Sequence, residues 1–277
     1  MKRRLIQLCA ALLYNLNLKG FAEASIYKGK SKGLCVPGLN CYSCPGAVGS
    51  CPLGTLQNAL SAMDRKLPFY ILGVLLLFGV TMGRTICGFI CPFGLVQELL
   101  YKIPVPKIKK NRVTRELSRV KYVILAVFVI ILPVVFKAAS GLPVPAFCKY
   151  ICPAGTLEGG IPLVLLDDSL SGLAGALFHW KVLVLAVILV SACFLYRSFC
   201  RILCPLGAIY SLFAPVALLG VRIDRDTCVD CGRCVRTCKM DVRQVGDREC
   251  IQCGECMKEC NVDAIYWKKP WDVKSKR

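Results

Sequence analysis

The sequence predicts an α-helical integral membrane protein with an internal repeat, followed by a small α+β domain at the carboxyl end. Three observations support this fold class. The chain of 277 residues is 56% hydrophobic, which is too apolar for an ordinary soluble domain. A Cys-Pro-x-Gly motif occurs four times, at Cys51, Cys91, Cys152 and Cys204. The carboxyl-terminal region contains two closely spaced runs of cysteines instead.

The charge of the chain indicates a lipid bilayer as a partner and no nucleic acid. The formal net charge is +19, from 36 Lys and Arg against 17 Asp and Glu. These basic residues concentrate in short stretches beside apolar runs, as they do at the cytoplasmic ends of membrane helices. Nucleic-acid binding is therefore set aside.

The first apolar stretch is short and interrupted by polar residues. Residues 5–18 predict a short helix that either crosses the membrane or lies at its surface. The alternative is a cleaved signal peptide, because the chain begins with basic residues and has an Ala-x-Ala sequence at Ala22 and Ala24.

Three longer apolar segments predict membrane helices, at about residues 69–90, 120–136 and 181–199. Between the first two, residues 102–121 contain eight Lys or Arg against one acid, which places this loop in the cytoplasm. We therefore expect a multi-pass protein of the cytoplasmic membrane. Its membrane domain would comprise residues 1–219 and its cytoplasmic domain residues 220–277.

The cytoplasmic domain carries the most specific motif. The spacing Cys-x2-Cys-x2-Cys-x3-Cys occurs twice, as in bacterial two-cluster ferredoxins, where the fourth cysteine of each run binds the other cluster. A zinc module is the alternative, but the close third cysteine fits a four-iron cluster better. The expected ligands are Cys228, Cys231, Cys234 and Cys260 for one 4Fe–4S cluster, and Cys250, Cys253, Cys256 and Cys238 for the other.

The membrane domain repeats Cys-x3-Cys-Pro-x-Gly at the cytoplasmic ends of two expected helices. The cysteines are Cys87 and Cys91 in one half, and Cys200 and Cys204 in the other. The proline favours a new helix whose first amides and dipole would face thiolates. Two halves related by an axis along the membrane normal would bring four thiols together around a third cluster. Reduced thiols that pack as small hydrophobic groups are the alternative.

Six cysteines would lie at the outer face: Cys35, Cys41, Cys44, Cys51, Cys148 and Cys152. By the repeat, the last two pair most simply with Cys44 and Cys51, while Cys35 and Cys41 could complete or replace that set. We expect one or more clusters here. A disulfide between spare thiols, or a cluster held by the four amino-terminal cysteines alone, is the alternative.

No group of residues in the sequence indicates a catalytic site. His179 is the only histidine, and Gln97 and Glu98 fall on the expected solvated face of a short amphipathic helix.

From Cys87 to Cys260 the chain resembles the membrane-bound polyferredoxins of the NapH/NosR type. The resemblance rests on the two Cys-x3-Cys-Pro pairs and the eight ferredoxin cysteines. It implies electron transfer between the cytoplasmic side, or the quinone pool, and an extracytoplasmic acceptor. The amino-terminal cysteines and the pair Cys148 and Cys152 go beyond the simplest pattern of that family and leave the acceptor open.

These observations predict a membrane-embedded iron–sulfur subunit that relays single electrons. Its partners would be ferredoxin or quinone inside, and a flavoprotein or reductase outside. An electron carrier is favoured over a self-sufficient enzyme. The alternatives are a quinol dehydrogenase or metal-ion reductase, and an iron–sulfur redox sensor or assembly factor.

Overall fold

The computed structural model describes residues 2–61, 68–108, 110–167, 169, 172 and 175–268, so the last nine residues of the expected 220–277 domain lie outside it. Its helices and strands, in chain order, are α1 (Lys2–Tyr14), α2 (Lys19–Ala22), η1 (Lys30–Gly33), α3 (Pro52–Ser61), α4 (Phe69–Thr81), α5 (Thr85–Phe89), α6 (Pro92–Leu100), α7 (Arg112–Leu117), α8 (Val120–Ile124), η2 (Leu125–Ile131), α9 (Leu132–Ser140), α10 (Ala146–Tyr150), η3 (Gly155–Gly160), α11 (Ile161–Leu166), α13 (Ala176–Phe194), α14 (Ser198–Ile202), α15 (Pro205–Phe213), β1 (Gly220–Ile223), α16 (Arg233–Thr237), η4 (Glu255–Glu259) and β2 (Ile265–Lys268).

Two helices of the described part are long and apolar enough to cross a membrane. One is the continuous helix Arg112–Ser140, formed by α7, α8, the π-helical stretch η2 and α9, and the other is α13. In each, only 17% of the most apolar 18-residue window is buried inside the protein. The side chains of these two windows are therefore mostly apolar and not buried inside the protein.

The fold class expected from the sequence is wrong. It requires three long membrane helices, but the segment at 69–90 divides into α4 and α5. The division follows from Gly83, which adopts a left-handed conformation (φ +50°) that ends the first helix. Two candidate spanning helices therefore remain in the described residues.

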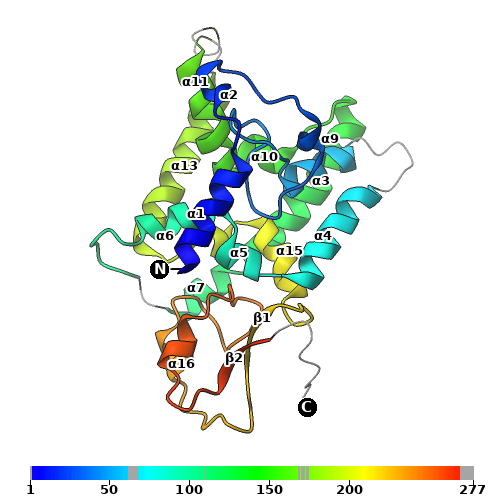
Figure 1. Cartoon of the computed structure of the whole chain (residues 1–277). Helices are drawn as coiled ribbons and strands as arrows, with labels where there is room; N and C mark the ends of the chain where they lie inside the picture. Colours follow the sequence, from blue (N-terminus) through cyan, green and yellow to red (C-terminus); the bar gives the residue numbers. More distant parts are fainter. Residues whose placement is uncertain are drawn as a thin grey trace.

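The expected α+β ferredoxin domain is also not evident. Between residues 220 and 268, the regular structure consists of β1 and β2, paired antiparallel, the five-residue helix α16 and the 3-10 turn η4. The two cysteine runs contain only the short elements α16 and η4. The segment packs against the helical part and is not a separate α+β unit (Figure 1).

Different elements lie at the two ends of the helical part. In Figure 1, β1, β2 and α16 lie beyond one end of the bundle, near α7, while α2, α10 and α11 lie toward the other. One hydrophobic core extends through the bundle and includes Cys51, Cys91, Cys204 and Cys250. The four Cys-Pro-x-Gly motifs thus lie in the interior and not on loops at the surface.

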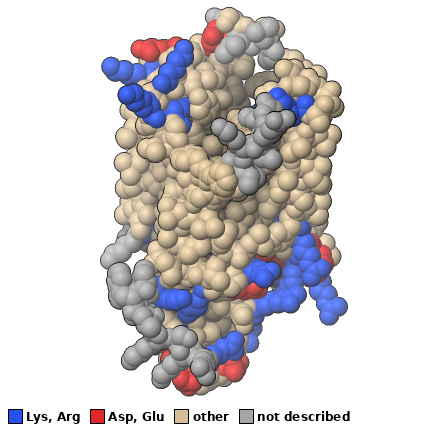
Figure 2. Space-filling view, turned by 90° about the vertical axis from the view of Figure 1, so that its right-hand side faces the viewer, with Lys and Arg blue, Asp and Glu red and all other residues tan. Residues whose placement is uncertain are grey.

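The surface between these ends is apolar. Figure 2 shows a broad band without Lys, Arg, Asp or Glu, with charged side chains above and below it. On α13, Leu183, Val187 and Val190 are each more than half exposed. Continuous apolar surface of this kind is typical of contact with lipid or another protein.

Candidate metal centres

The inner set of cysteines, Cys87, Cys91, Cys200 and Cys204, lies where two short helices end and two others begin. α5 and α14 carry the first cysteine of each pair, and the second is the N-cap of α6 or α15. Cys91 (φ −74°, ψ 117°) and Cys204 (φ −74°, ψ 110°) are both extended, as the following prolines favour. The two halves fold alike here, and all four thiols line one cavity.

The glycine of each inner motif lies against an arginine of the other half. A Cβ at Gly94 would lie 3.2 Å from Nη1 of Arg197, and one at Gly207 would lie 3.0 Å from Nη1 of Arg84. Arg84 donates to the carbonyl oxygen of Gly207 at 3.2 Å, and Arg197 donates to the carbonyl oxygen of Cys87. Both arginines are fully buried. Two positive charges therefore lie beside the inner set.

Two glutamines, each six residues after a Cys-Pro cysteine, join the halves. Gln97 donates to Sγ of Cys200 at 3.0 Å, and its side-chain oxygen accepts from the backbone amide of Phe199 at 3.1 Å. Gln57 makes the equivalent bonds at the outer side: it donates to Sγ of Cys148 at 3.3 Å and accepts from the backbone amide of Phe147 at 2.9 Å. Gln97 and Glu98 are both buried, so the expectation that they face solvent is wrong.

At the outer side, the structure brings together four thiols, which we call the outer set: Cys41, Cys51, Cys148 and Cys152. A Cβ at Gly155 would lie 3.7 Å from Sγ of Cys152 and 3.8 Å from Sγ of Cys41. Cys152 is hydrogen-bonded to Cys148, and Cys51 lies within electrostatic range of Cys152 and Cys41. This set again combines two cysteines from each half of the repeat.

Cys35 and Cys44 make hydrogen bonds outside the outer set, although Cys44 lies within electrostatic range of Cys41. Cys44 donates to a side-chain amide oxygen at 3.4 Å, and Cys35 donates to a threonine hydroxyl at 3.5 Å. Cys41 occupies the position that the repeat gives most simply to Cys44. Its backbone amide donates to Oε2 of the partly buried Glu158 at 2.7 Å, which holds the Cys41 loop against η3.

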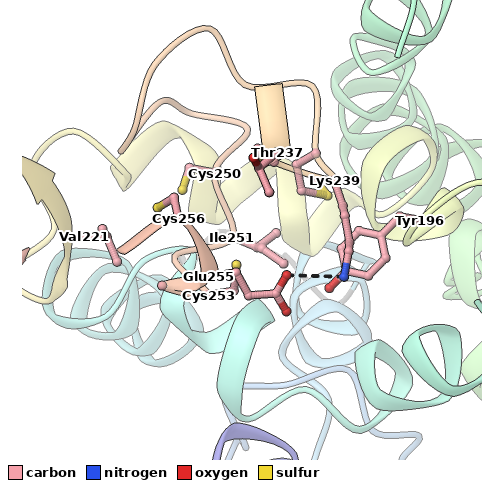
Figure 3. A pocket seen from close by; sticks show the side chains of 12 residues that line it. Tyr196, Val221, Thr237, Lys239, Cys250, Ile251, Cys253, Glu255 and Cys256 are labelled. Carbon is pink, nitrogen blue, oxygen red and sulfur yellow. Dashed lines mark ion pairs between the residues drawn. The ribbon is translucent and has the colours of Figure 1, made fainter. Parts of the chain in front are cut away.

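The eight carboxyl-terminal cysteines form two groups. Cys238, Cys250, Cys253 and Cys256, the second C-terminal set, line one pocket (Figure 3). The first C-terminal set is Cys228, Cys231, Cys234 and Cys260. Cys234 lies within electrostatic range of Cys228 and Cys231, and Cys234 and Cys260 pack on one small core of Val221, Val245 and Ile265. Cys231 is exposed, so this set is the one nearest to solvent.

The inner set is linked to its neighbours by one contact of the backbone and one contact of a tyrosine side chain. A Cβ at Gly88, between the inner cysteines, would overlap the carbonyl oxygen of Ile251 and lie 3.9 Å from the amide of Cys253. The inner motif therefore touches the loop of the second C-terminal set. On the other side, the Tyr210 hydroxyl donates to the carbonyl oxygen of Pro37 at 2.9 Å. Tyr210 lies within electrostatic range of Cys51, Cys87 and Cys91, and thus between the inner and outer sets.

Burial favours the protonated form of several of these thiols. It raises the pKa of Cys91, Cys51 and Cys41 to about 12. It also raises the pKa of Cys200, but there Arg197 and then Arg84 favour the thiolate and oppose the rise. Because metals bind the thiolate, cluster binding at these sites displaces protons.

The residues present fit 4Fe–4S clusters. Four thiols are the ligand set of such a cluster. The inner set and the second C-terminal set each line a cavity, and thiols of the outer set lie within electrostatic range of one another. Within the described ranges, no group of three or more His, Cys, Asp or Glu side chains is compact enough to hold a single metal ion. The thiols surround a space and do not converge on one point, which suits a cluster better than one tetrahedral ion.

The sequence analysis missed Arg84, Arg197 and Gln57. The signal was present in the repeat, because each arginine stands three residues before the first inner cysteine of its half. Likewise, Gln57 and Gln97 stand six residues after Cys51 and Cys91. An alignment of the halves that extended beyond the cysteines would have found these residues.

Comparison with known proteins identifies a family that matches more than half of the chain. The chain matches the 4Fe–4S binding domain family at residues 50–70, 67–111, 122–161 and 176–223, together more than half of its length. These matches contain all four Cys-Pro-x-Gly motifs but not the carboxyl-terminal cysteine runs. No solved structure matches the chain.

Several curated proteins are similar to parts of the chain. An uncharacterised protein of Methanocaldococcus jannaschii is 30% identical over 61% of this chain and 64% of its own. YccM of Escherichia coli, provisionally named an electron transport protein, is 23% identical over 70% of this chain and 54% of its own. The methylamine utilization ferredoxin-type protein MauN of Paracoccus denitrificans is 27% identical over 70% of this chain and 62% of its own. The chain thus spans between about half and two thirds of these relatives.

Proposed function

Because the chain belongs to the 4Fe–4S binding domain family, we propose that it is an electron-transfer subunit associated with the cytoplasmic membrane. The observation that carries this proposal is the contact between successive thiol sets. The core that holds Cys51, Cys91 and Cys204 also holds Cys250, so three of the four sets share one interior. The two relatives named for electron transport or as ferredoxin-type agree with this function.

The proposed ligands follow the geometry. The inner set and the two C-terminal sets each hold one cluster, and the outer set holds a fourth through Cys41, Cys51, Cys148 and Cys152. When bound, such clusters supply one-electron redox chemistry. The chain buries the thiols of the inner set, brings that set against the second C-terminal set at Gly88, and leaves Cys231 accessible to a partner.

The helices Arg112–Ser140 and α13 are the proposed membrane anchors. The basic loop before the first of them lies on the side of the C-terminal sets, because Nζ of Lys110 donates to the carbonyl oxygen of Val235 at 2.6 Å. By the positive-inside rule, this side is cytoplasmic. We therefore assign residues 1–219 to a membrane-associated unit and residues 220–277 to the cytoplasmic side, with ferredoxin or quinone as donor. A flavoprotein or reductase would meet the outer set, as for the NapH/NosR type.

One observation favours a second function, the oxidation of a quinol. An apolar pocket of about 340 Å³ opens beside α13 and α14, and Phe199 next to Cys200 contributes to its wall. Its polar side chains are Ser191 and Ser198, whose hydroxyls are 2.7 Å apart. Turnover of a quinol analogue by the purified chain alone would support this function over a carrier that needs a partner at each end.

Electron transfer across a vesicle wall tests the main proposal. The chain is loaded with iron and sulfide anaerobically and inserted into liposomes that contain oxidised cytochrome c, and dithionite is added outside. The wild-type chain should reduce the enclosed cytochrome faster than protein-free vesicles allow. The variant Cys87→Ser should lose this activity, because the inner set then lacks one thiol.

The matched control is Cys193→Ser. Cys193 lies on α13 outside all four sets, and its thiol donates to the carbonyl oxygen of Leu189. This variant should behave as the wild type does. Equal activity of Cys87→Ser and Cys193→Ser, or a wild-type rate no higher than that of empty vesicles, would overturn the proposed function.

A further inference from the structure

Arg84 and Arg197 are unusual because they are large, charged and fully buried beside the inner set. They occupy equivalent positions in the two halves, and each lies within electrostatic range of Cys200. A buried charge is costly unless an opposite charge compensates it. We therefore expect negative charges close to both arginines.

Arg197 shares its carboxylate with a second cation. Its Nη2 atom lies 2.6 Å from Oε1 of Glu98, whose side chain is 2% exposed. The same Oε1 lies 2.6 Å from Nη1 of Arg3, which also reaches the carbonyl oxygen of Gly88. Two arginines thus share one buried carboxylate, which leaves one positive charge. Arg3 has a further contact with Glu255 at 3.3 Å, but that carboxylate is 45% exposed and is also paired with Lys239.

Arg84 repeats this arrangement with different residues. Its Nη2 atom lies 3.0 Å from Oε2 of Glu249. Nζ of Lys121, which is fully buried on α8, lies 2.6 Å from Oε1 of the same Glu249. Here too, two cations share one carboxylate and one positive charge remains.

The inner set therefore lies between two groups with an excess of about two positive charges. The neighbouring Arg201 does not add to this excess, because it forms a buried one-to-one pair with Asp241. Four protonated thiols would leave the excess uncompensated. A 4Fe–4S core held by four thiolates carries a net charge of about −2 in its oxidised form, which matches the excess in size and opposes it in sign.

We propose that Arg84 and Arg197 are positioning residues that neutralise the inner cluster and raise its reduction potential above that of a cluster without them. The inference rests on the proposed function, since it assumes that the inner set binds a cluster. Reduction adds one electron and so one negative charge. Because each arginine attracts that charge at a buried site, the loss of either should disfavour reduction.

A redox titration of the inner cluster, followed by electron paramagnetic resonance, tests the inference. The variants are Arg84→Gln and Arg197→Gln in the full-length chain loaded with iron. Each should weaken the electron affinity of the inner cluster about tenfold or more, which is a fall of about 59 mV for a one-electron couple. The charge-conserving variants Arg84→Lys and Arg197→Lys should recover most of that fall.

The variant Glu98→Gln separates the charge effect from a structural one. It removes a negative charge from the same group, so it should shift the potential upward while Arg197→Gln shifts it downward. Arg119→Gln is the control, since Arg119 is 66% exposed and paired on the surface, and it should leave the potential unchanged. Only an electrostatic role predicts shifts of opposite sign.

The outcomes separate the inference from the proposed function. If the inner set binds four irons but the reduction potential of its cluster is unchanged in the Gln variants, the inference is overturned and the proposed function is not. If the Gln variants of Arg84 and Arg197 lose iron, the potentials of Glu98→Gln and of the two Lys variants test the inference instead. An upward shift in the first and a near-normal potential in the others support the inference, and a downward shift in Glu98→Gln overturns it. The absence of an inner-cluster signal in the wild type would overturn both.

Discussion

Glu98 should be among the most sensitive positions for stability outside the cysteines. Its carboxylate accepts hydrogen bonds from Arg3, Tyr196 and Arg197, at distances between 2.6 and 2.9 Å. In Glu98→Gln, Arg197 keeps its place but loses its counter-charge. Removal of one partner from a buried ion pair costs about 3–5 kcal/mol. We take the lower end, about 3 kcal/mol, because the second cation, Arg3, is 14% exposed and retains some solvation.

This loss should appear as a lower melting temperature in detergent, followed by tryptophan fluorescence. One kcal/mol corresponds to about 2–4 °C in chains of 150–250 residues, so a fall of about 6–12 °C is expected. Glu116→Gln is the control, because Glu116 pairs with Arg119 at the surface, where both side chains are more than half exposed. That pair is worth less than about 1 kcal/mol. Equal melting temperatures for the two variants would refute the account of the buried network.

The same carboxylate should make stability depend on pH. Burial alone would raise the pKa of Glu98, but the charge of Arg197 and the bonds from Arg3 outweigh it and hold the pKa below its usual value of 4.5. A carboxyl group with a depressed pKa stabilises the folded chain above its unfolded pKa, and this contribution is lost as the pH falls below 4.5 through the folded pKa. Melting temperatures measured between neutral and acid pH should therefore converge for the wild type and Glu98→Gln. A constant difference over the whole range would contradict this.

Three further predictions follow from the cysteine sets. Cys41→Ser should lower the iron content by about four per chain, whereas Cys44→Ser should leave it unchanged, as measured by iron and sulfide assay. Gly88→Ala should force the inner motif away from Ile251, at a cost of about 1–3 kcal/mol in stability, and should slow reduction of the enclosed cytochrome without loss of iron. Cluster assembly on the iron-free chain should release about one proton per binding thiol, seen with a pH indicator, because burial raises the thiol pKa values.

Each of these has a defined contrary result. Loss of iron from Cys44→Ser but not from Cys41→Ser would show that Cys44, and not Cys41, is the ligand at the outer side. The control for Gly88→Ala is Gly73→Ala on α4, where a Cβ would meet no atom within 4 Å. Equal transfer rates in these two variants would show that the Gly88 contact is not part of the path. Assembly without proton release would mean that the thiols are already ionised.

The cysteine sets could be predicted from the sequence to a large extent, because ligand spacing is a local property. The repeat of Cys-x3-Cys-Pro-x-Gly was enough to bring Cys87, Cys91, Cys200 and Cys204 to one cavity. The choice between Cys41 and Cys44 was not local. It depends on the bond between the Cys41 amide and Glu158, which lies 117 residues away in the sequence.

The helices were less predictable, because hydropathy does not detect a turn within an apolar run. The segment at 69–90 is apolar throughout, yet it breaks where Gly83 takes a left-handed conformation. In the same way, Glu98 and Gln97 are polar side chains on a short helix, and a helical pattern alone places them in solvent. Their burial depends on Arg197 and Cys200 from the other half of the chain.

The central claim is that four cysteine sets each hold a 4Fe–4S cluster. The most direct test is the content of iron and acid-labile sulfide per chain after strictly anaerobic purification in detergent. The account predicts about sixteen irons and about sixteen sulfides. About eight would mean that only the carboxyl-terminal cysteines bind iron, which would contradict the inner and outer sites and the path between them.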